Sequence, residues 1–386
     1  MSTKQRLVHL LSSAARRSGL RTLIAVSPVT EWVWRRTRAL ALGPTTAASQ
    51  ETAAITATET PGTQAAAPAP SLLTPPIGVA FERPKFRAAL KARYERLNLS
   101  PEITELYSGF ALSTVERGEQ LRQKLSAHTD ITGKRYLDVG CAYGGFPVAF
   151  HAAGAREVVG FDYDPELLGY AHALREDYGH PLRLEQASIL SEALPERFGR
   201  FDIITCNDVI EHVSDPGLAL EHLAGLLNPG GLLCMEIPNR WSADFVLRDG
   251  HFYKYALTSL PKYLADRRFS RETQGGVHDV TYKSLNWYLH RLRRAGLNAS
   301  VDLGGASDPS ATLARASATF DEVEWKARAP ETDALSARYA RRVAATFRTA
   351  HGRWRGTGAA SDETARRLEI TFATNFWTLI ATAPSA

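Results

Sequence analysis

The alternation of strand-like and helical segments from residue 135 onward is the feature that most restricts how this chain can fold. Helical stretches begin near residues 145, 165 and 216, and a further one covers 282–295. The strand-like runs between and after them read RYLDVG, EVVGFDY, PLRLEQAS, FDIITCND, GGLLCMEIP, LNASVDLGG and NFWTLIATAP. Strands that alternate with helices pack as a parallel sheet with helices on both faces. The sequence therefore predicts an α/β fold with a doubly wound, Rossmann-like sheet of seven strands.

Composition divides the chain into segments. Residues 1–40 form a basic arm with a net charge of +7, although the whole chain carries only +5. Residues 41–77 are rich in Ala, Thr and Pro, and we expect a disordered linker there. The folded domain is predicted to cover 78–386, with helices near 86–97 and 102–127 before the first strand. Two further segments, 241–280 and 306–370, are expected to be cap or insertion segments over the ligand site.

The charge of the arm leaves the remaining residues at −2, so the folded part has no electrostatic footprint for nucleic acid. The arm itself could be a solvated tail, a weak membrane-surface anchor or an organelle transit peptide, and we favour the first two. No apolar run reaches the roughly 18 residues that a membrane span requires. The three cysteines form no CxxC pair and are expected to be reduced core thiols. We therefore expect a cytoplasmic protein, either free or peripheral at the membrane.

The stretch LDVGCAYGG at 137–145 predicts a ligand site. A strand ends there, and Gly140, Gly144 and Gly145 give a loop whose backbone can approach a ligand closely. Alone this is a weak signal, because the stretch also fits the G-x-A-x-x-G form of a dinucleotide fingerprint. The second strand ends beside the first, at Asp162, where a carboxylate can accept both hydroxyls of a ribose. The alternative is that Asp162 or Asp164 starts the next helix.

Four motifs together resemble the class I S-adenosylmethionine-dependent methyltransferases: LDVGCAYGG, VVGFDYD, FDIITCNDVIEHVSDP and LAGLLNPGGLL. The resemblance covers about residues 130–240 and is nearest to the ubiquinone-biosynthesis O-methyltransferase branch. Asp138 favours it over a nicotinamide-binding protein. A carboxylate before the glycine turn would repel a pyrophosphate, whereas S-adenosylmethionine carries an ammonium and a sulfonium. S-Adenosyl-L-methionine is therefore the expected cofactor.

The resemblance implies roles for individual residues. The backbone of the loop would contact the methionine part of the cofactor, Asp162 the ribose and Tyr163 the adenine, with Asn207 under the sulfonium. Many relatives have an aspartate near the end of strand three for the adenine amine, but here Ser188 precedes Ile189, so the charge assistance is lost. The expected cofactor-binding residues are Asp138, Gly140, Cys141, Ala142, Gly144, Asp162, Tyr163, Ser188, Ile189 and Asn207.

Asp208, Glu211 and His212 stand at i, i+3 and i+4, so one helical face could present all three. In the branch that the chain resembles, carboxylates of this segment can hold a divalent metal. The spacing Asp208-x-x-Glu211 is also that of a capping box, in which the two side chains satisfy backbone donors at a helix start. We favour the capping box, with His212 facing the cofactor or the substrate, and predict no metal.

The methyl acceptor is expected beyond strand five, because ligands gather at the carboxyl ends of the strands. Methyl transfer from a sulfonium to oxygen is an in-line displacement, and a base removes the proton of the hydroxyl. Histidine suits that work near neutral pH. His278, beside Asp279 and after a Gly-Gly pair, is our first choice for the base, His251 is the second, and His212 is a further candidate.

These observations predict an S-adenosylmethionine-dependent methyltransferase that methylates the oxygen of a small-molecule, sugar or lipid-like hydroxyl, with histidine-assisted deprotonation. Two alternatives remain open at this point: an NAD(P)-dependent oxidoreductase, and a non-catalytic module that binds S-adenosylmethionine. The sequence does not predict the oligomeric state.

Overall fold

The computed structural model describes residues 82–97, 101–304, 308–356 and 362–385. The basic arm (1–40), the linker (41–77) and the expected start of the domain at 78 lie outside the described residues, so the predictions made for them stay predictions. Within the described ranges, no helix combines the length and the apolar character needed to cross a membrane.

Seven strands form one sheet in the order β3-β2-β1-β4-β5-β7-β6. Their bounds are β1 Arg135–Val139, β2 Glu157–Asp162, β3 Arg183–Gln186, β4 Phe201–Asn207, β5 Leu227–Pro238, β6 Asn298–Asp302 and β7 Phe376–Thr382. The first five pair in parallel, and the strand order reverses beside β1, between β1 and β4. This is the switch point at which doubly wound sheets bind their ligands. The predicted fold class is confirmed.

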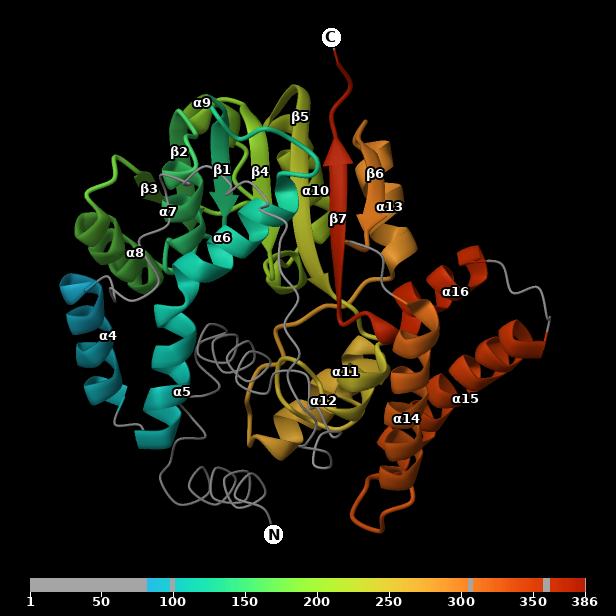
Figure 1. Cartoon of the computed structure of the whole chain (residues 1–386). Helices are drawn as coiled ribbons and strands as arrows, with labels where there is room; N and C mark the ends of the chain where they lie inside the picture. The colour runs from blue at the N-terminus through green and yellow to red at the C-terminus, as the bar shows by residue number, and fades with distance from the viewer. Residues whose placement is uncertain (1–81, 98–100, 305–307, 357–361, 386) are drawn as a thin grey trace, which may run out of the picture.

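Strand β7 departs from the parallel sheet expected from alternation, because it runs antiparallel to both β5 and β6. The chain leaves β6 at the carboxyl edge of the sheet, and the helices that follow pack beside that edge (Figure 1). None of the described helices between β6 and β7 returns the chain to the opposite edge, so β7 enters the sheet from the edge where β6 ended. It therefore runs in the opposite direction.

Helices cover both faces of the sheet, and successive residues of a strand face alternate sides of it. Tyr136 and Val158 face one apolar core, whereas their neighbours Leu137 and Val159 face the other. The first core is closed by α4 (Pro84–Leu97), α5 (Pro101–Leu112), α6 (Thr114–Leu125), α7 (Gly145–Ala152) and α8 (Pro165–Tyr178). The second is closed by α9 (Leu194–Phe198), α10 (Pro216–Gly225) and α13 (Leu285–Arg294).

The helix expected at 102–127 is two helices, α5 and α6, which break at Ser113. The Ser113 hydroxyl donates a hydrogen bond of 3.0 Å to the carbonyl of Phe110, one turn earlier. A serine that bonds the backbone in this way competes with the regular helical pattern. The break lets α5 and α6 run in different directions beside the ligand edge of the sheet (Figure 1).

A helical cap lies beyond the carboxyl ends of the strands (Figure 1). Its first part contains α11 (Ala243–Leu247), η2 (Leu257–Ser259) and α12 (Lys262–Glu272). Its second part contains α14 (Pro309–Lys326), α15 (Ala334–Gly356), α16 (Asp362–Leu368) and the π-helical turn η3 (Glu369–Ala373). Phe320, Phe347 and Phe372 from the second part pack ring against ring, in a core shared with α11. The two parts therefore form one packed body at the ligand edge.

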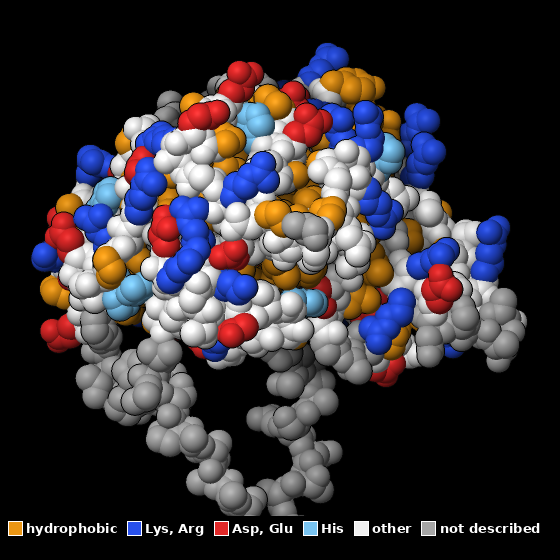
Figure 2. Space-filling view, turned by 90° about the horizontal axis from the view of Figure 1, so that it is seen from above, with side chains coloured by type: hydrophobic (Ala, Val, Ile, Leu, Met, Phe, Trp, Pro, Cys, Tyr) orange, Lys and Arg blue, Asp and Glu red, His pale blue; other side chains and the backbone are white. Residues whose placement is uncertain are grey.

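The cysteines and the surface charges agree with the composition. Cys141, Cys206 and Cys234 are all buried and free of disulfides, which confirms the prediction of reduced core thiols. On the face seen from above, Lys and Arg side chains are interspersed with Asp and Glu (Figure 2).

Gly145, the first residue of α7, allows α6 and α7 to approach closely. A Cβ there would lie 2.3 Å from the carbonyl carbon of Thr114 and 2.4 Å from its oxygen, and both are backbone atoms that cannot rotate away. We expect Gly145→Ala to lower the free energy of unfolding by about 2 kcal/mol or more, because overpacking forces the backbone apart. Urea unfolding followed by circular dichroism measures the change.

Gly169 on α8 is the matched control, because a Cβ at that exposed helical position meets nothing within 4 Å. Gly169→Ala should raise the free energy of unfolding by about 0.5–1 kcal/mol, since alanine loses less backbone entropy on folding. Equal effects of the two substitutions would contradict the close approach of α6 to α7.

Candidate active site

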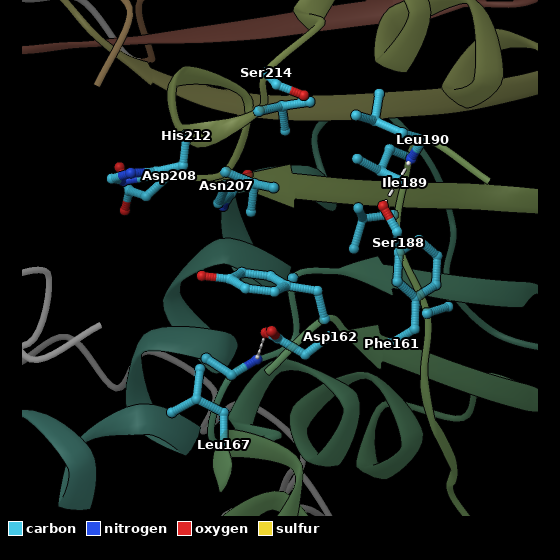
Figure 3. Close-up of a pocket in the computed structure, with 17 residues that line it drawn as sticks. Phe161, Asp162, Leu167, Ser188, Ile189, Leu190, Asn207, Asp208, His212 and Ser214 are labelled. Atoms are coloured by element: carbon cyan, nitrogen blue, oxygen red, sulfur yellow. Dashed lines mark hydrogen bonds between the residues drawn. The ribbon is translucent and has the colours of Figure 1, made fainter. Parts of the chain in front are cut away.

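A cavity of about 300 Å³ opens at the carboxyl ends of β1, β2 and β4, beside the point where the strand order reverses (Figure 3). Its wall contains seven of the expected cofactor residues: Gly140, Ala142, Asp162, Tyr163, Ser188, Ile189 and Asn207. The other residues of the wall are Val139, Phe161, Leu167, Ala187, Leu190, Asp208, Val209, His212, Val213 and Ser214. The expected residues Asp138, Cys141 and Gly144 support the loop from behind and do not line the cavity.

The loop after β1 is tied to the end of β2. The backbone N–H groups of Gly140 and Cys141 both donate to the carbonyl of Phe161, over 2.8 and 3.0 Å. Gly140 has φ +71°, and a Cβ there would lie 2.4 Å from a methyl carbon of Val209. Glycine is therefore required at this position by both the backbone conformation and the available space.

Asp162 lies in the cavity wall at the end of β2 and is almost fully buried. Its carboxylate accepts hydrogen bonds from the backbone N–H groups of Ala142, over 2.9 Å, and Asp164, over 3.0 Å. Burial raises the pKa of Asp162 to about 6, and these backbone bonds oppose the shift. The helix cap is made by Asp164, which accepts from the N–H of Glu166 over 2.8 Å. Asp162 is therefore not used as the cap, and its remaining lone pairs are available to a ligand.

Asp138 lies behind the loop in a buried hydrogen-bond chain. Its Oδ1 accepts from the hydroxyl of Thr205 over 2.7 Å, and Thr205 is 2.6 Å from the hydroxyl of Tyr136. Burial raises the pKa of Asp138 to about 7. Asp138 makes its hydrogen bond within the sheet and not toward the cavity. When it is ionised, its negative charge can still act electrostatically on a ligand bound at the loop.

Three residues of the cavity wall offer an aromatic ring, a hydroxyl and an amide. The ring of Tyr163 is more than half exposed beside the cavity, although a large aromatic side chain usually avoids such exposure. The hydroxyl of Ser188 accepts from the N–H of Leu190 over 3.2 Å (Figure 3). Asn207, at the end of β4, is fixed in the cavity wall, because its side-chain oxygen accepts from the N–H of Glu236 over 3.0 Å.

The capping box predicted at Asp208 and Glu211 is wrong. The helical turn here is η1 (Ile210–His212), its N-cap is Val209, and no side chain caps it. Asp208 has φ +54°, in the left-handed region that a capping residue does not adopt. The longer helix α10 begins later, and its cap is Asp215. Asp208 and Glu211 therefore belong to a tight turn at the cavity and not to a helix start.

His212 lines the cavity, and a residue far away in the sequence orients it. Its Nδ1 lies 3.0 Å from Oδ2 of Asp279, which belongs to the loop before α13. An ionised carboxylate only accepts, so the neutral tautomer that fits this contact has its proton on Nδ1, and Nε2 lies 4.0 Å from Oε1 of Glu211. The pair is a histidine held in one tautomer by a carboxylate, beside the ligand cavity.

His251 lies behind His212, with 5.1 Å between the ring centroids. Its Nε2 is 3.4 Å from Oε1 of Glu211, and its Nδ1 is 2.8 Å from the hydroxyl of Tyr282. One carboxylate oxygen of Glu211 and one nitrogen each of His212 and His251 lie within 4.8 Å of one another. A carboxylate with two imidazoles is a donor set that divalent transition metals accept, so these three residues fit a metal ion.

The structure does not bring His278, our first choice for the base, to the cavity. Its ring packs against Phe252 and Phe269 in an apolar cluster under α12, and its Nδ1 is 2.7 Å from Oδ1 of Asp266. Burial lowers the pKa of His278, and the bond to Asp266 opposes that shift. His278 is therefore a core histidine whose Nδ1 has a partner, whereas its buried Nε2 has none among the described residues.

Several residues of the site were not identified from the sequence. Leu190 lies outside the quoted motifs, and Val209, Val213 and Ser214 lie within FDIITCNDVIEHVSDP but were given no role of their own. Asp279 was noted only as the neighbour of His278, and its contact with His212 joins residues 67 positions apart. No local pattern indicates such a pairing, because only the folded cap brings the two loops together.

The sheet order and the site define a Rossmann-like enzyme that binds a nucleoside-containing ligand at the switch point. A family model described as a methyltransferase domain matches residues 114–299. The ubiquinone biosynthesis O-methyltransferase of Methylococcus capsulatus is 35% identical over 202 residues, which cover 48% of this chain and 84% of that protein. The same-named protein of Aromatoleum aromaticum is 30% identical over 185 residues, which cover 48% of this chain and 73% of that protein.

Other matches are shorter or more remote. The match to the Xanthomonas oryzae protein of that name spans only 51% of its length, at 37% identity. A solved structure of an S-adenosylmethionine-dependent methyltransferase from Mesorhizobium loti is 19% identical and covers 69% of this chain and 99% of that one, with a TM-score of 0.40.

The chain belongs to the class I S-adenosylmethionine-dependent methyltransferase family. It is a methyltransferase whose cofactor is S-adenosyl-L-methionine, and the oxidoreductase alternative is set aside. The residues of the cavity fit this cofactor. A buried carboxylate stands at the tip of β2, an exposed tyrosine ring lies beside it, and no Lys or Arg is among the described residues that line the wall.

Asp138 gives a pH dependence that can be measured. The pKa of Asp138 is raised from 3.8 to about 7, so the folded protein keeps a proton that the unfolded chain loses in this window. Stability should therefore fall as pH rises from about 4 to 7. Asp138→Asn keeps an acceptor for Thr205 and removes the titration, so it should raise the free energy of unfolding at pH 8 by about 2 kcal/mol.

Urea unfolding of both proteins at pH 5 and pH 8 tests this expectation. The variant should gain stability relative to the natural chain at pH 8 and much less at pH 5. An equal difference at the two pH values would show that Asp138 does not carry a raised pKa.

Proposed function

We propose that the protein transfers the methyl group of S-adenosyl-L-methionine to a hydroxyl oxygen of a small-molecule acceptor, with His212 as the group that takes the proton of the hydroxyl. The observation that carries this proposal is the contact of His212, which lines the cofactor cavity, with Asp279 behind it. The O-methyltransferase names of the relatives with long alignments also support oxygen as the methylated atom.

We infer that the cofactor is seated by residues of the loop and of the strand ends. Asp162 accepts the ribose hydroxyls with the lone pairs that Ala142 and Asp164 leave available. The exposed ring of Tyr163 packs on the adenine, and Ser188 lies at the adenine end. The methionine part lies along the backbone of Gly140 and Ala142, with Asn207 under the sulfonium.

The charge of the cavity supports a cationic ligand. Asp162 and Asp208 both line the wall, and Asp138 lies just behind it. A pyrophosphate would face these carboxylates without a Lys or Arg among the lining residues that the structure describes, whereas a sulfonium and an ammonium are attracted to them.

In this proposal the enzyme contributes position and one proton transfer. The acceptor hydroxyl lies between the methyl group and Nε2 of His212, so that the oxygen attacks the carbon in line with the breaking C–S bond. The hydroxyl proton passes to Nε2, and S-adenosylhomocysteine leaves without charge on sulfur. Asp279 holds the ring in position and stabilises the imidazolium that forms.

Glu211, His212 and His251 would hold a divalent cation if the protein uses one. Such an ion lowers the pKa of an oxygen that it binds, so it would supply the deprotonation by another route. His251 is also fixed by Tyr282, whose hydroxyl donates to Asp249 over 2.8 Å.

The raised pKa of Asp162 makes cofactor affinity depend on pH. Only the ionised carboxylate accepts from both ribose hydroxyls, so affinity should rise as pH increases through about 6 and level off above it. Asp162→Asn should weaken binding at pH 8 by about 1–3 kcal/mol, because it leaves a ribose hydroxyl unpaired. It should also remove the dependence around pH 6.

Calorimetric titration of S-adenosylhomocysteine from pH 5 to pH 8 measures both effects. Natural affinity in the variant at pH 8 would remove Asp162 from the ribose site.

His212→Asn should lower the turnover number by roughly 10²-fold or more with little change in cofactor affinity, because it removes the proton acceptor. Asparagine retains a donor near the place of Nδ1, so the contact with Asp279 is kept. The measurement is methyl transfer from labelled S-adenosylmethionine to the hydroxyl compound that a panel of phenols, sugars and isoprenoid alcohols identifies as the acceptor.

His278→Asn is the matched control, because it keeps a donor toward Asp266 and lies outside the cavity wall. It should change turnover by no more than about threefold. The reverse order of the two variants would restore His278 as the base. Dialysis against EDTA separates the two routes for the proton: retained activity supports His212 alone, whereas loss of activity that Mn²⁺ or Mg²⁺ restores would mean that the three-residue cluster holds an ion.

The remaining part of the proposal concerns the chemical class of the methyl acceptor. We propose a small-molecule, sugar or lipid-like hydroxyl compound that enters between the sheet and the cap. The suggested contact of residues 1–40 with a membrane surface, and the cytoplasmic location, stay proposals that vesicle binding and fractionation can test.

A further inference from the structure

A second cavity, of about 490 Å³, lies in the cap and shares no wall residue with the cofactor cavity. It is bounded by the chain that follows β5, by the segment around η2, by α15 and by the turn η3. Trp241, Tyr339 and Phe372 give it aromatic walls, and Ser259, Thr346 and Thr371 add hydroxyls. A cavity with apolar walls and a few polar groups is typical of a small-molecule site.

The only charged groups among the described residues that line this cavity are two arginines, Arg240 and Arg342. No described carboxylate forms an ion pair with either of them. Four other arginines of the cap have such partners among the described residues. Arg268, for example, pairs with Glu272, and Arg348 pairs with Asp321. The cavity therefore combines aromatic walls with two positive charges that have no counter-charge.

Arg240 is held rigidly in the cavity wall. Its Nε donates to the carbonyl of Thr258 over 3.1 Å, and one terminal nitrogen donates to the carbonyl of Leu260 over 2.9 Å. Its guanidinium also lies over the ring of Trp241, 4.7 Å from the ring centroid. Burial lowers the pKa of Arg240, and no carboxylate opposes that shift. Arg240 is half-buried, so its guanidinium has lost part of its hydration, and the negative charge of a ligand would compensate for that loss.

Arg342 provides the second, more mobile charge. It is an exposed residue of α15, and the structure gives its guanidinium no hydrogen bond to a described residue. A guanidinium held in the wall and a second, solvent-exposed one that also lines the cavity suit an anion that enters from solvent. Guanidinium groups bind carboxylates and phosphates with two parallel hydrogen bonds.

We propose that this cavity binds an anionic ligand with an aromatic or similarly flat apolar body, whose carboxylate or phosphate lies between Arg240 and Arg342 and whose body lies against Trp241, Tyr339 and Phe372. The proposal goes beyond methyl transfer, because it concerns a cavity with different walls and does not require the cofactor. Tyr282 and Tyr339 pack against the same apolar cluster, and Tyr282 bonds to His251. The cavity therefore adjoins the supporting residues of the active site.

The test compares three probes of similar size: benzoate, phenyl phosphate and neutral benzyl alcohol. Each is titrated into the full chain and followed by calorimetry or by saturation-transfer NMR. We expect at least one of the two anions to bind about tenfold or more tightly than benzyl alcohol, because its bonds to the guanidinium groups are charge-assisted. The tighter anion then identifies the ligand as a carboxylate or a phosphate.

Arg342→Gln should weaken binding of that anion about tenfold, whereas Arg341→Gln, at the next exposed position of the same helix, should change it less than about twofold. Both variants should bind S-adenosylhomocysteine as the natural chain does, so a failure here is distinct from a failure of the proposed reaction. Equal binding of the anions and benzyl alcohol, no binding of either anion, or equal effects of the two substitutions would overturn the proposal.

Discussion

The attachment of the loop after β1 to the tip of β2 is the constraint on which the rest of the site depends. Two backbone N–H groups of the loop share the carbonyl of Phe161, and the N–H of Ala142 is held by the carboxylate of Asp162. The same carboxylate must therefore both shape the loop and face the ligand. The burial that positions the Asp162 carboxylate for both roles also disfavours its ionised form, so the pKa of Asp162 is raised.

The sheet could be predicted from the sequence because its information is local. Four of the first five strands contain an apolar run, the exception being β3 with the sequence RLEQ, and a helix follows each of the five. The positions of Asp162 and Asn207 at strand ends follow directly. The direction of β7 could not be predicted in this way, since it depends on where the preceding helices leave the chain. The position of Ser113 within one long helical pattern likewise gave no sign that its hydroxyl would break the helix.

The candidate site likewise contains residues that local sequence patterns predict and residues whose roles depend on long-range contacts. Residues supplied by strand ends and by the glycine loop were identified from their motifs, and seven of them line the cavity. The side chains for the proton transfer could not be ranked, because their roles are set by contacts across the cap. His278 has an attractive local sequence but a core environment, whereas His212 acquires an orienting carboxylate from 67 residues away. The spacing of Asp208 and Glu211 fits both a capping box and a metal site. The left-handed backbone conformation of Asp208 excludes the capping box.

The residues that line the cofactor cavity all lie between positions 139 and 214, whereas the second cavity, for which we propose an anionic ligand, is lined by residues of the cap and of the chain that follows β5. A crystal structure of the full chain with S-adenosylhomocysteine tests the central claim most directly. The account predicts the ribose hydroxyls on Asp162, the adenine against Tyr163, and the sulfur on the side of the cavity where Nε2 of His212 lies. A ribose bound away from Asp162, or a sulfur that faces away from His212, would contradict it.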